Sequence, residues 1–330
     1  MKRRLTLTVM TAAVLGLLTP LAMSQGKTVL KIGWTSSDGA QDPYAVGARA
    51  FKEAVERESK GSFDVQFFPN RALGDERQML EGMRFGTLDM GIITNAVIAQ
   101  IESGFQVNDL PFLYANEEQA HKVLDGPVGA ELGKRLATKG IVALGFMEGG
   151  FRNMINNKRP VSTPADVQGV KYRVMQNPVF IDMFTSLGGA AVPMAWGETF
   201  TAVQQGTIDG LEIPVAVIDA NKYYEVTRYL SLTNHTYSMI GLLISKRTLD
   251  KLTPEQRKAV EAAGKAATLA QRKTTVADVK GTLANLEKNG MKINAVSDVN
   301  PFRKSVAPVY DKFRKGSDGA LLDKVFAEIK

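Results

Sequence analysis

The sequence contains no cysteine and only two histidines among its 330 residues. Disulfide bonds, thiol catalysis and a lipid-modified N-terminal cysteine are therefore excluded, and a cysteine–histidine zinc site cannot be assembled. The motifs of phosphate-binding loops, serine hydrolases, zinc proteases and dinucleotide-binding folds are also missing. We therefore expect a protein without metal, cofactor or catalytic activity. The alternative is an enzyme whose catalytic groups are only carboxylates or tyrosine.

The chain has one long uncharged apolar run, residues 5–21. This run is nearly as long as a segment that spans a membrane, and no other run approaches that length. This run follows the basic residues 2–4 and precedes the small-residue sequence 22–24, which is the layout of a secretory signal. We predict that residues 1–24 are a cleaved signal peptide, with a retained membrane anchor as the alternative. The exported protein is then expected to be soluble in the periplasm.

No run of like charge occurs outside the predicted signal. Outside the predicted signal, 38 Lys and Arg (41 minus 3) stand against 34 Asp and Glu, a net charge of +4 (38 minus 34), and the two signs are interspersed. A surface for nucleic acid is therefore not expected. A domain of about 300 residues can bury a large core and commonly divides in two, so we predict two lobes and a monomer.

The predicted mature chain begins with the pattern of an α/β protein. Residues 28–34 form an alternating apolar run typical of a buried strand, and Pro43 begins a predicted helix that continues to about Lys60. Residues 63–68 form a second predicted strand. The order strand, helix, strand favours a parallel α/β sheet.

Two distant segments follow one plan. Residues 75–85 and 198–205 each predict a short helix that is stopped by a glycine, Gly86 or Gly206, and each is followed by a strand. The shared sequence Gly-Thr-(Leu/Ile)-Asp indicates two similarly built lobes, although such junctions also occur in unrelated α/β proteins.

A long helix is predicted towards the C-terminus. Thr253 is a candidate N-cap before Pro254, and helical composition continues to about Gly290. A helix of about 35 residues would be roughly 50 Å long, which exceeds the width of one lobe, so it could underlie both. Two consecutive helices broken near Gly281 are the alternative.

Two arginines stand near the ends of predicted strands. Arg152 follows a strand that ends in glycines, and Arg173 lies in the apolar strand 170–175 just before a turn. An unpaired guanidinium in a mostly buried strand costs on the order of several kcal/mol, so Arg173 needs an anionic partner. From the residues alone, that partner is either an acid of the chain or the carboxylate of a ligand.

Six motifs spread over the chain resemble those of one family. They are GDERQML (74–80), DLPFLY (109–114), GFRN (150–153), RVMQNPVF (173–180), PMAWGE (193–198) and QQGTIDGLEIP (205–214). In this order they closely resemble the DctP-type extracytoplasmic receptors of TRAP transporters. The resemblance implies a type II periplasmic-binding fold, with two α/β lobes around a central cleft and a long helix spanning both. We assign residues 25–149 and about 239–279 to lobe I, and residues 150–238 and about 280–330 to lobe II.

The resemblance also implies the ligand-binding residues. Arg173 would form a paired salt bridge with the ligand carboxylate, because a planar guanidinium fork matches two carboxylate oxygens better than lysine does. Arg152 matches a second position that contacts the acid or a neighbouring hydroxyl. The other candidate pocket residues are Glu76, Asn95, Trp196, Glu212, Ile213, His235 and Tyr237. Glu76 could instead only cap its helix, and Trp196 could be ordinary core.

One position departs from the family pattern. Family members commonly carry an asparagine where this chain has Ile213, so an amide contact near the ligand carboxylate is lost unless Glu212 or another residue replaces it. The resemblance still implies a receptor that captures an organic acid and delivers it to a TRAP membrane permease. A sugar acid such as a uronate or aldonate is favoured, and a C4-dicarboxylate, 2-oxo or aromatic acid is the alternative. A ligand-sensing subunit or an exported carboxylate-using enzyme is the alternative class.

Overall fold

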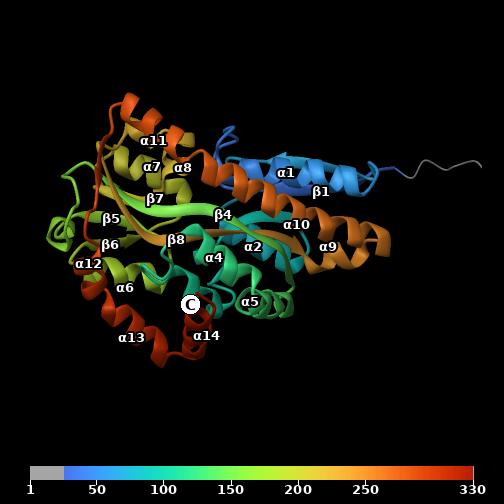
Figure 1. Ribbon diagram of the computed structural model, residues 1–330. Helices are drawn as coiled ribbons and strands as arrows, with labels where there is room; N and C mark the ends of the chain where they lie inside the picture. The colour runs from blue at the N-terminus through green and yellow to red at the C-terminus, as the bar shows by residue number, and fades with distance from the viewer. Residues whose placement is uncertain (1–25, 330) are drawn as a thin grey trace, which may run out of the picture.

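A computed structural model describes residues 26–329, so the predicted signal peptide lies outside the described residues. These residues form one nine-stranded sheet with helices on both faces (Figure 1). The strands are β1 (Thr28–Gly33), β2 (Phe63–Phe68), β3 (Met90–Thr94), β4 (Ile141–Asn156), β5 (Lys171–Val174), β6 (Ala190–Pro193), β7 (Gly210–Pro214), β8 (Tyr229–Ser245) and β9 (Lys292–Ala295).

The α-helices in the same part of the chain are α1 (Pro43–Glu58), α2 (Glu76–Phe85), α3 (Asn95–Ile98), α4 (Glu117–Asp125), α5 (Pro127–Thr138), α6 (Pro178–Ser186), α7 (Trp196–Gln204), α8 (Val215–Ala220), α9 (Lys246–Lys251), α10 (Pro254–Ala277), α11 (Val279–Lys288), α12 (Asn300–Ser305), α13 (Ala307–Lys315) and α14 (Gly319–Ile329). Short 3-10 helices are η1 (Ser103–Asp109), η2 (Pro164–Val167) and η3 (Tyr223–Glu225).

The strand order is symmetric about two long central strands. The sheet runs β2-β1-β3-β8-β4-β7-β5-β6, and β9 pairs with β8. The strands β1, β2 and β3 form a parallel unit at one end, and β5, β6 and β7 form the equivalent unit at the other. The antiparallel strands β8 and β4 join the two units. The predicted α/β fold with two similarly built lobes is confirmed by this arrangement.

The two predicted helix–glycine–strand segments have the same local structure. Gly86 after α2 and Gly206 after α7 both adopt left-handed backbone, with φ of 79° and 70°. Glycine adopts this conformation without a Cβ penalty and so reverses the chain into the next strand. In each motif the aspartate accepts a hydrogen bond from a backbone N–H of its own parallel unit. The pairs are Asp89 with Lys31 at 3.1 Å and Asp209 with Lys171 at 2.9 Å.

The predicted long helix is interrupted. Helix α10 ends at Ala277 and α11 begins at Val279, so the break is at Asp278. The alternative of two consecutive helices had placed the break near Gly281. The β-branched run 274–276 precedes the break, and such residues have lower helix propensity than alanine or leucine. Helix α10 packs on α1 and β4, while α11 packs on α8, so the pair extends over both lobes (Figure 1). A helical spine under both lobes is confirmed, and a single unbroken helix is wrong.

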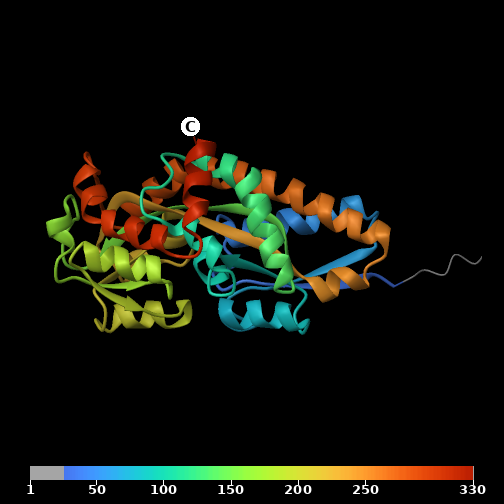
Figure 2. The ribbon, with the colours of Figure 1, turned by 90° about the horizontal axis from the view of Figure 1, so that it is seen from below.

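Two glycines allow α10 to lie directly on the central strand β4. A Cβ atom at Gly264 would lie 2.6 Å from the Cβ of Leu144, and one at Gly145 would lie 1.9 Å from Oγ1 of Thr268. Only glycine allows a helix and a strand to approach this closely. Figure 2 shows α10, in orange, on one side of the sheet, with α2 (cyan) and α7 (yellow) on the other.

The last helices are distributed over both lobes. Helix α13 packs on α6, whereas α14 packs on α4 and α5 of the first lobe. Leu321, Leu322 and Val325 of α14 are buried in that contact region. The predicted division assigned about residues 280–330 to lobe II and did not include this contact of α14 with α4 and α5, and its boundaries stay a prediction.

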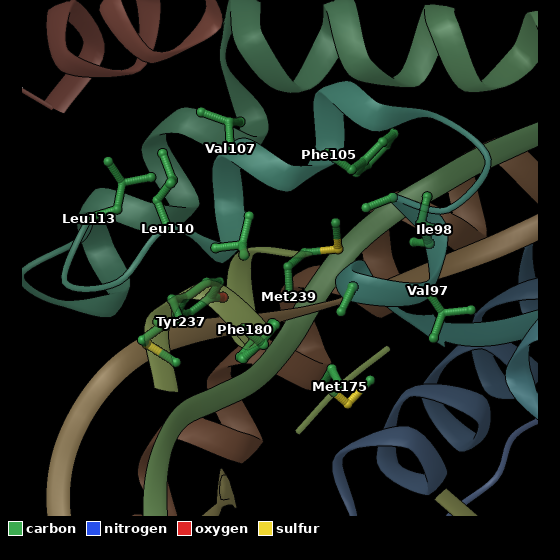
Figure 3. Close-up of a cluster of buried hydrophobic side chains, with 14 of the residues drawn as sticks. Val97, Ile98, Phe105, Val107, Leu110, Leu113, Met175, Phe180, Tyr237 and Met239 are labelled. Atoms are coloured by element: carbon green, nitrogen blue, oxygen red, sulfur yellow. The ribbon is translucent and has the colours of Figure 1, made fainter. Parts of the chain in front are cut away.

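A hydrophobic cluster on one face of the sheet fixes the central strand β8. Figure 3 shows Phe105 and Val107 of η1 in the same cluster as Tyr237 and Met239 of β8. These four side chains are almost completely buried. Close packing of this kind leaves few alternative side-chain positions, so β8 is a rigid support for the region between the lobes.

Candidate ligand-binding site

A cavity lies between the two lobes, near the carboxyl ends of their parallel strands. One side comes from the segment after β1, from the end of β3 and from the start of α2, and the other side comes from β5, β7, α7 and α8. The space between these walls, open solvent at its mouth included, is about 440 Å³. Of the predicted site residues, those that line it are Arg173, Arg152, Glu76, Trp196 and Ile213.

Arg173 is a buried cation without an acidic partner among residues 26–329. Its side chain lies in β5, and the residue is 2% exposed. Its Nε donates to the carbonyl of Met194 at 2.9 Å, and its Nη1 lies 3.3 Å from Sδ of Met175, so both contacts are neutral. Burial lowers the pKa of Arg173 from its ordinary value, yet a guanidinium keeps its proton in proteins. The cavity therefore contains a positive charge that the described part of the chain does not pair.

Arg152 lines the same cavity, but an acid of the protein pairs with it. Its Nε and Nη2 donate to the two carboxylate oxygens of Glu212, and Nη2 also donates to the Glu212 carbonyl at 2.6 Å. Burial disfavours both charges, but their mutual attraction outweighs it, so the pKa of Arg152 is raised and the pKa of Glu212 is lowered. Nη1 of Arg152 lies 3.3 Å from Oγ of Ser238, which also lines the cavity.

Glu212 and His235 do not line the cavity but lie behind its wall, and their predicted contact with a ligand stays a prediction. Successive residues of a strand point to opposite faces, so Ile213 faces the cavity and Glu212 points away from it. His235 is fully buried, with Nε2 at 3.4 Å from Glu212 and Nδ1 at 2.7 Å from Oγ1 of Thr233. Burial lowers the pKa of His235, so it is neutral at neutral pH.

Asn95 and Tyr237 also do not line the cavity, because the hydrogen bonds of each turn it into the core. Asn95 donates to the carbonyl of Phe105 at 2.9 Å and accepts from Asn108 at 3.3 Å. The hydroxyl of Tyr237 donates to Oε2 of Glu148 at 2.8 Å. Both side chains lie in the core, and their predicted contact with a ligand stays a prediction.

Glu76, the first residue of α2, supplies the acidic group of the cavity. Its Oε1 accepts from the backbone N–H of Thr94 at 2.8 Å and from the Thr94 hydroxyl at 3.0 Å. The same hydroxyl lies 2.5 Å from the hydroxyl of Tyr44. Burial raises the pKa of Glu76 to about 7, against the lowering effect of the Thr94 hydrogen bonds and of Arg173. The group therefore changes charge near neutral pH.

This pKa gives Glu76 a measurable effect on stability. A carboxyl with a raised folded-state pKa stabilises the fold fully below its unfolded value of 4.5, and this contribution is lost as the pH rises through about 7. The Glu76→Gln variant keeps the acceptor oxygen but does not titrate. We expect its thermal midpoint to fall less than that of the wild type between pH 5 and pH 8, measured by circular dichroism without ligand. Equal pH dependence of the two proteins would contradict this assignment.

The remaining lining divides into a polar and an apolar side. The polar group consists of Thr35, Ser36, Tyr44, Thr94 and Ser238, and the apolar group consists of Met175, Trp196, Ile213, Pro214 and Val217. Trp196 is half-buried, 5.4 Å from Tyr223 between ring centroids, so it belongs to both the cavity and the packing around it. Sequence reasoning missed the polar group. Ligands bind at the carboxyl ends of parallel strands, and that rule could have found Thr35, Ser36 and Thr94.

The fold and the cavity define a class of protein. In residues 26–329, two α/β lobes joined by long central strands enclose a cavity in which Arg173 has no acidic partner, which is the architecture of a binding protein for an anionic solute. Residues 35–316 match the family described as bacterial extracellular solute-binding protein, family 7. The chain belongs to this family, and its resemblance to the DctP-type receptors of TRAP transporters is confirmed.

Solved structures and a curated relative agree with this assignment. A TRAP periplasmic solute-binding protein from Polaromonas sp. JS666, bound to D-erythronate, has 39% sequence identity and a TM-score of 0.87, covering 92% of this chain and 98% of the other. A sugar-acid-binding protein from Advenella mimigardefordensis, in complex with galactonate, has 32% identity and a TM-score of 0.88 over the same shares. The 2,3-diketo-L-gulonate-binding periplasmic protein of Escherichia coli is 32% identical, over 91% of this chain and 92% of its own length.

The family places the chain among periplasmic transport proteins rather than among enzymes. Its members bind small acids and work with membrane permease components. Within residues 26–329, no helix has both the length and the apolar character to cross a membrane.

Proposed function

We propose that the protein is a periplasmic receptor that captures a sugar acid through one carboxylate and delivers it to a TRAP membrane permease. The observation that supports this proposal is Arg173, a buried guanidinium that faces the cavity without an acidic partner in the described chain. A ligand carboxylate would supply the missing negative charge and two hydrogen-bond acceptors.

The charges of the cavity favour a monocarboxylate over a C4-dicarboxylate. Arg152 and Arg173 are the cations of the lining, and Glu212 neutralises Arg152. A second carboxylate on the ligand would lie near Glu76 and have no unpaired cation of the lining to bind it. The two negative charges would repel each other. The relatives named above bind erythronate, galactonate and 2,3-diketo-L-gulonate, each of which has one carboxylate.

The polar and apolar sides of the cavity suit the rest of a sugar acid. Hydroxyls of the ligand would meet the polar group and Glu76, while its C–H face would pack against Trp196 and Ile213. Because Ile213 makes part of the cavity apolar, a 2-oxo or aromatic acid is the second candidate ligand. We further infer that the protein acts as a monomer, without catalysis, metal or nucleic acid, after removal of residues 1–24.

A thermal-shift screen with calorimetry tests the proposal. The probes are D-erythronate, D-galactonate, D-glucuronate and succinate, with erythritol and galactitol as uncharged controls. At about 100 times its dissociation constant, a bound sugar acid adds about 2.7 kcal/mol of stability, whereas the polyols add none because they lack the carboxylate. The acid should be recovered unchanged. Stabilisation by succinate alone, by no acid, or with turnover of the acid would contradict the proposal.

A further inference from the structure

The two lobes touch each other directly beside the cavity. The backbone N–H of Ser37, in the loop after β1, donates to Oδ1 of Asn221 at 3.1 Å, and the Ser37 hydroxyl donates to the carbonyl of Ala220 at 3.0 Å. Ala220 and Asn221 are at the end of α8, which follows β7. The strands β1 and β7 lie on opposite sides of the central β8–β4 pair. Any motion that separates the outer units therefore breaks these hydrogen bonds.

A chain of hydrogen bonds connects this contact to the cavity. Ser36, which lines the cavity, donates from Oγ to Oδ1 of Asp42 at 2.8 Å. Oδ2 of Asp42 accepts from Nδ2 of Asn221 at 3.4 Å, and the same Nδ2 donates to the carbonyl of the cavity residue Val217 at 3.0 Å. Asp42 is held in place because it also caps α1 through the N–H of Tyr44 at 3.0 Å. The contact and the cavity thus share neighbouring residues on both lobes.

We propose that Ser37 and Asn221 form a latch that holds the lobes closed, so that Asn221 sets ligand affinity without touching the ligand. Asn221 is a positioning residue, because it does not line the cavity. The proposal rests on the proposed function, since the bound acid and the latch stabilise the same closed form. Removing the latch lowers the population of that form, and apparent affinity falls by the same fraction.

The first test is the dissociation rate of D-erythronate from the Asn221→Ala variant. Two interlobe hydrogen bonds are lost, so affinity is expected to fall on the order of 10-fold, mainly through faster dissociation. The ranking of different acids should stay unchanged, because the cavity keeps its lining.

Asn289→Ala is the matched control. Asn289 follows the last turn of α11 in the same way that Asn221 follows the last turn of α8. Its Nδ2 donates to the carbonyl of Asn285 at 2.8 Å, and Nδ2 of Asn221 donates to the carbonyl of Val217 in the same way. The control variant removes the same kind of helix-end hydrogen bond without crossing between lobes. Its affinity and dissociation rate should equal those of the wild type. An equal loss in both variants would overturn the latch.

A distance measurement tests the latch without ligand. The chain has no cysteine, so Phe85→Cys and Gln204→Cys provide two unique sites for spin labels at the exposed ends of α2 and α7. Asn221→Ala should shift the interlobe distances of the free protein to longer values, and Asn289→Ala should not. Wild-type distances with a wild-type dissociation rate in Asn221→Ala would overturn the latch. If the wild type binds no sugar acid, the proposed function fails, while the distances still decide the latch.

Discussion

Replacing Arg173 by methionine is expected to weaken sugar-acid binding at least about 30-fold and, at the same time, to stabilise the ligand-free protein. Loss of one arm of a buried charge pair costs roughly 2–5 kcal/mol of binding free energy, and 2 kcal/mol is about 30-fold. Without ligand, however, the guanidinium is a buried charge whose hydrogen bonds within residues 26–329 go only to neutral groups of Met194 and Met175. An apolar side chain of similar size removes that penalty. Weaker binding together with higher stability of the free protein is expected if the charge of Arg173 binds the ligand and does not stabilise the fold.

Calorimetry of D-erythronate or D-galactonate and urea denaturation of the free protein measure the two effects. Arg173→Lys is the control, because it keeps a positive charge but loses the planar fork, and its affinity should lie between those of the wild type and the methionine variant. Unchanged affinity in Arg173→Met would contradict the carboxylate role. A large loss of stability in that variant would show that the fold itself needs the charge.

Replacing Glu212 by glutamine is expected to destabilise the protein by about 3 kcal/mol, because it leaves the buried Arg152 without a counter-charge. Both side chains are almost fully buried, so solvent cannot screen the charge that remains. The thermal midpoint and the free energy of unfolding in urea measure the loss.

Two further variants distinguish a lost charge pair from general damage. The double variant Arg152→Met/Glu212→Leu should recover most of the stability, because it removes both charges and leaves apolar side chains. Asp182→Asn breaks the exposed pair with Lys312 and should change stability little. A double variant no more stable than Glu212→Gln would show that the pair is not the source of the loss.

Much of the fold could be predicted from periodicity and turn chemistry. The predicted strand 63–68 is β2, and the two glycine-stopped helices are α2 and α7. Local rules succeed at such positions because glycine with left-handed backbone ends a helix independently of its tertiary neighbours. The break in the long helix was less predictable, since β-branched residues disfavour a helix only weakly and packing decides the outcome.

The candidate site could be predicted only in part, because local sequence patterns do not determine which distant strands pair. The sequence left open whether Arg173 meets an acid of the chain, and the structure shows none in its described part. It could not show that β4 and β7 bring Arg152 to Glu212, which removes one cation from the cavity. The contact of Ser37 with Asn221 is equally a product of tertiary structure.

The most direct test of the account is a crystal structure of the protein with bound D-erythronate or D-galactonate. We expect the two carboxylate oxygens to accept hydrogen bonds from Nη1 and Nη2 of Arg173, at about 2.7–2.9 Å each. A bound acid whose carboxylate lies elsewhere, with Arg173 still facing only Met194 and Met175, would contradict the central claim.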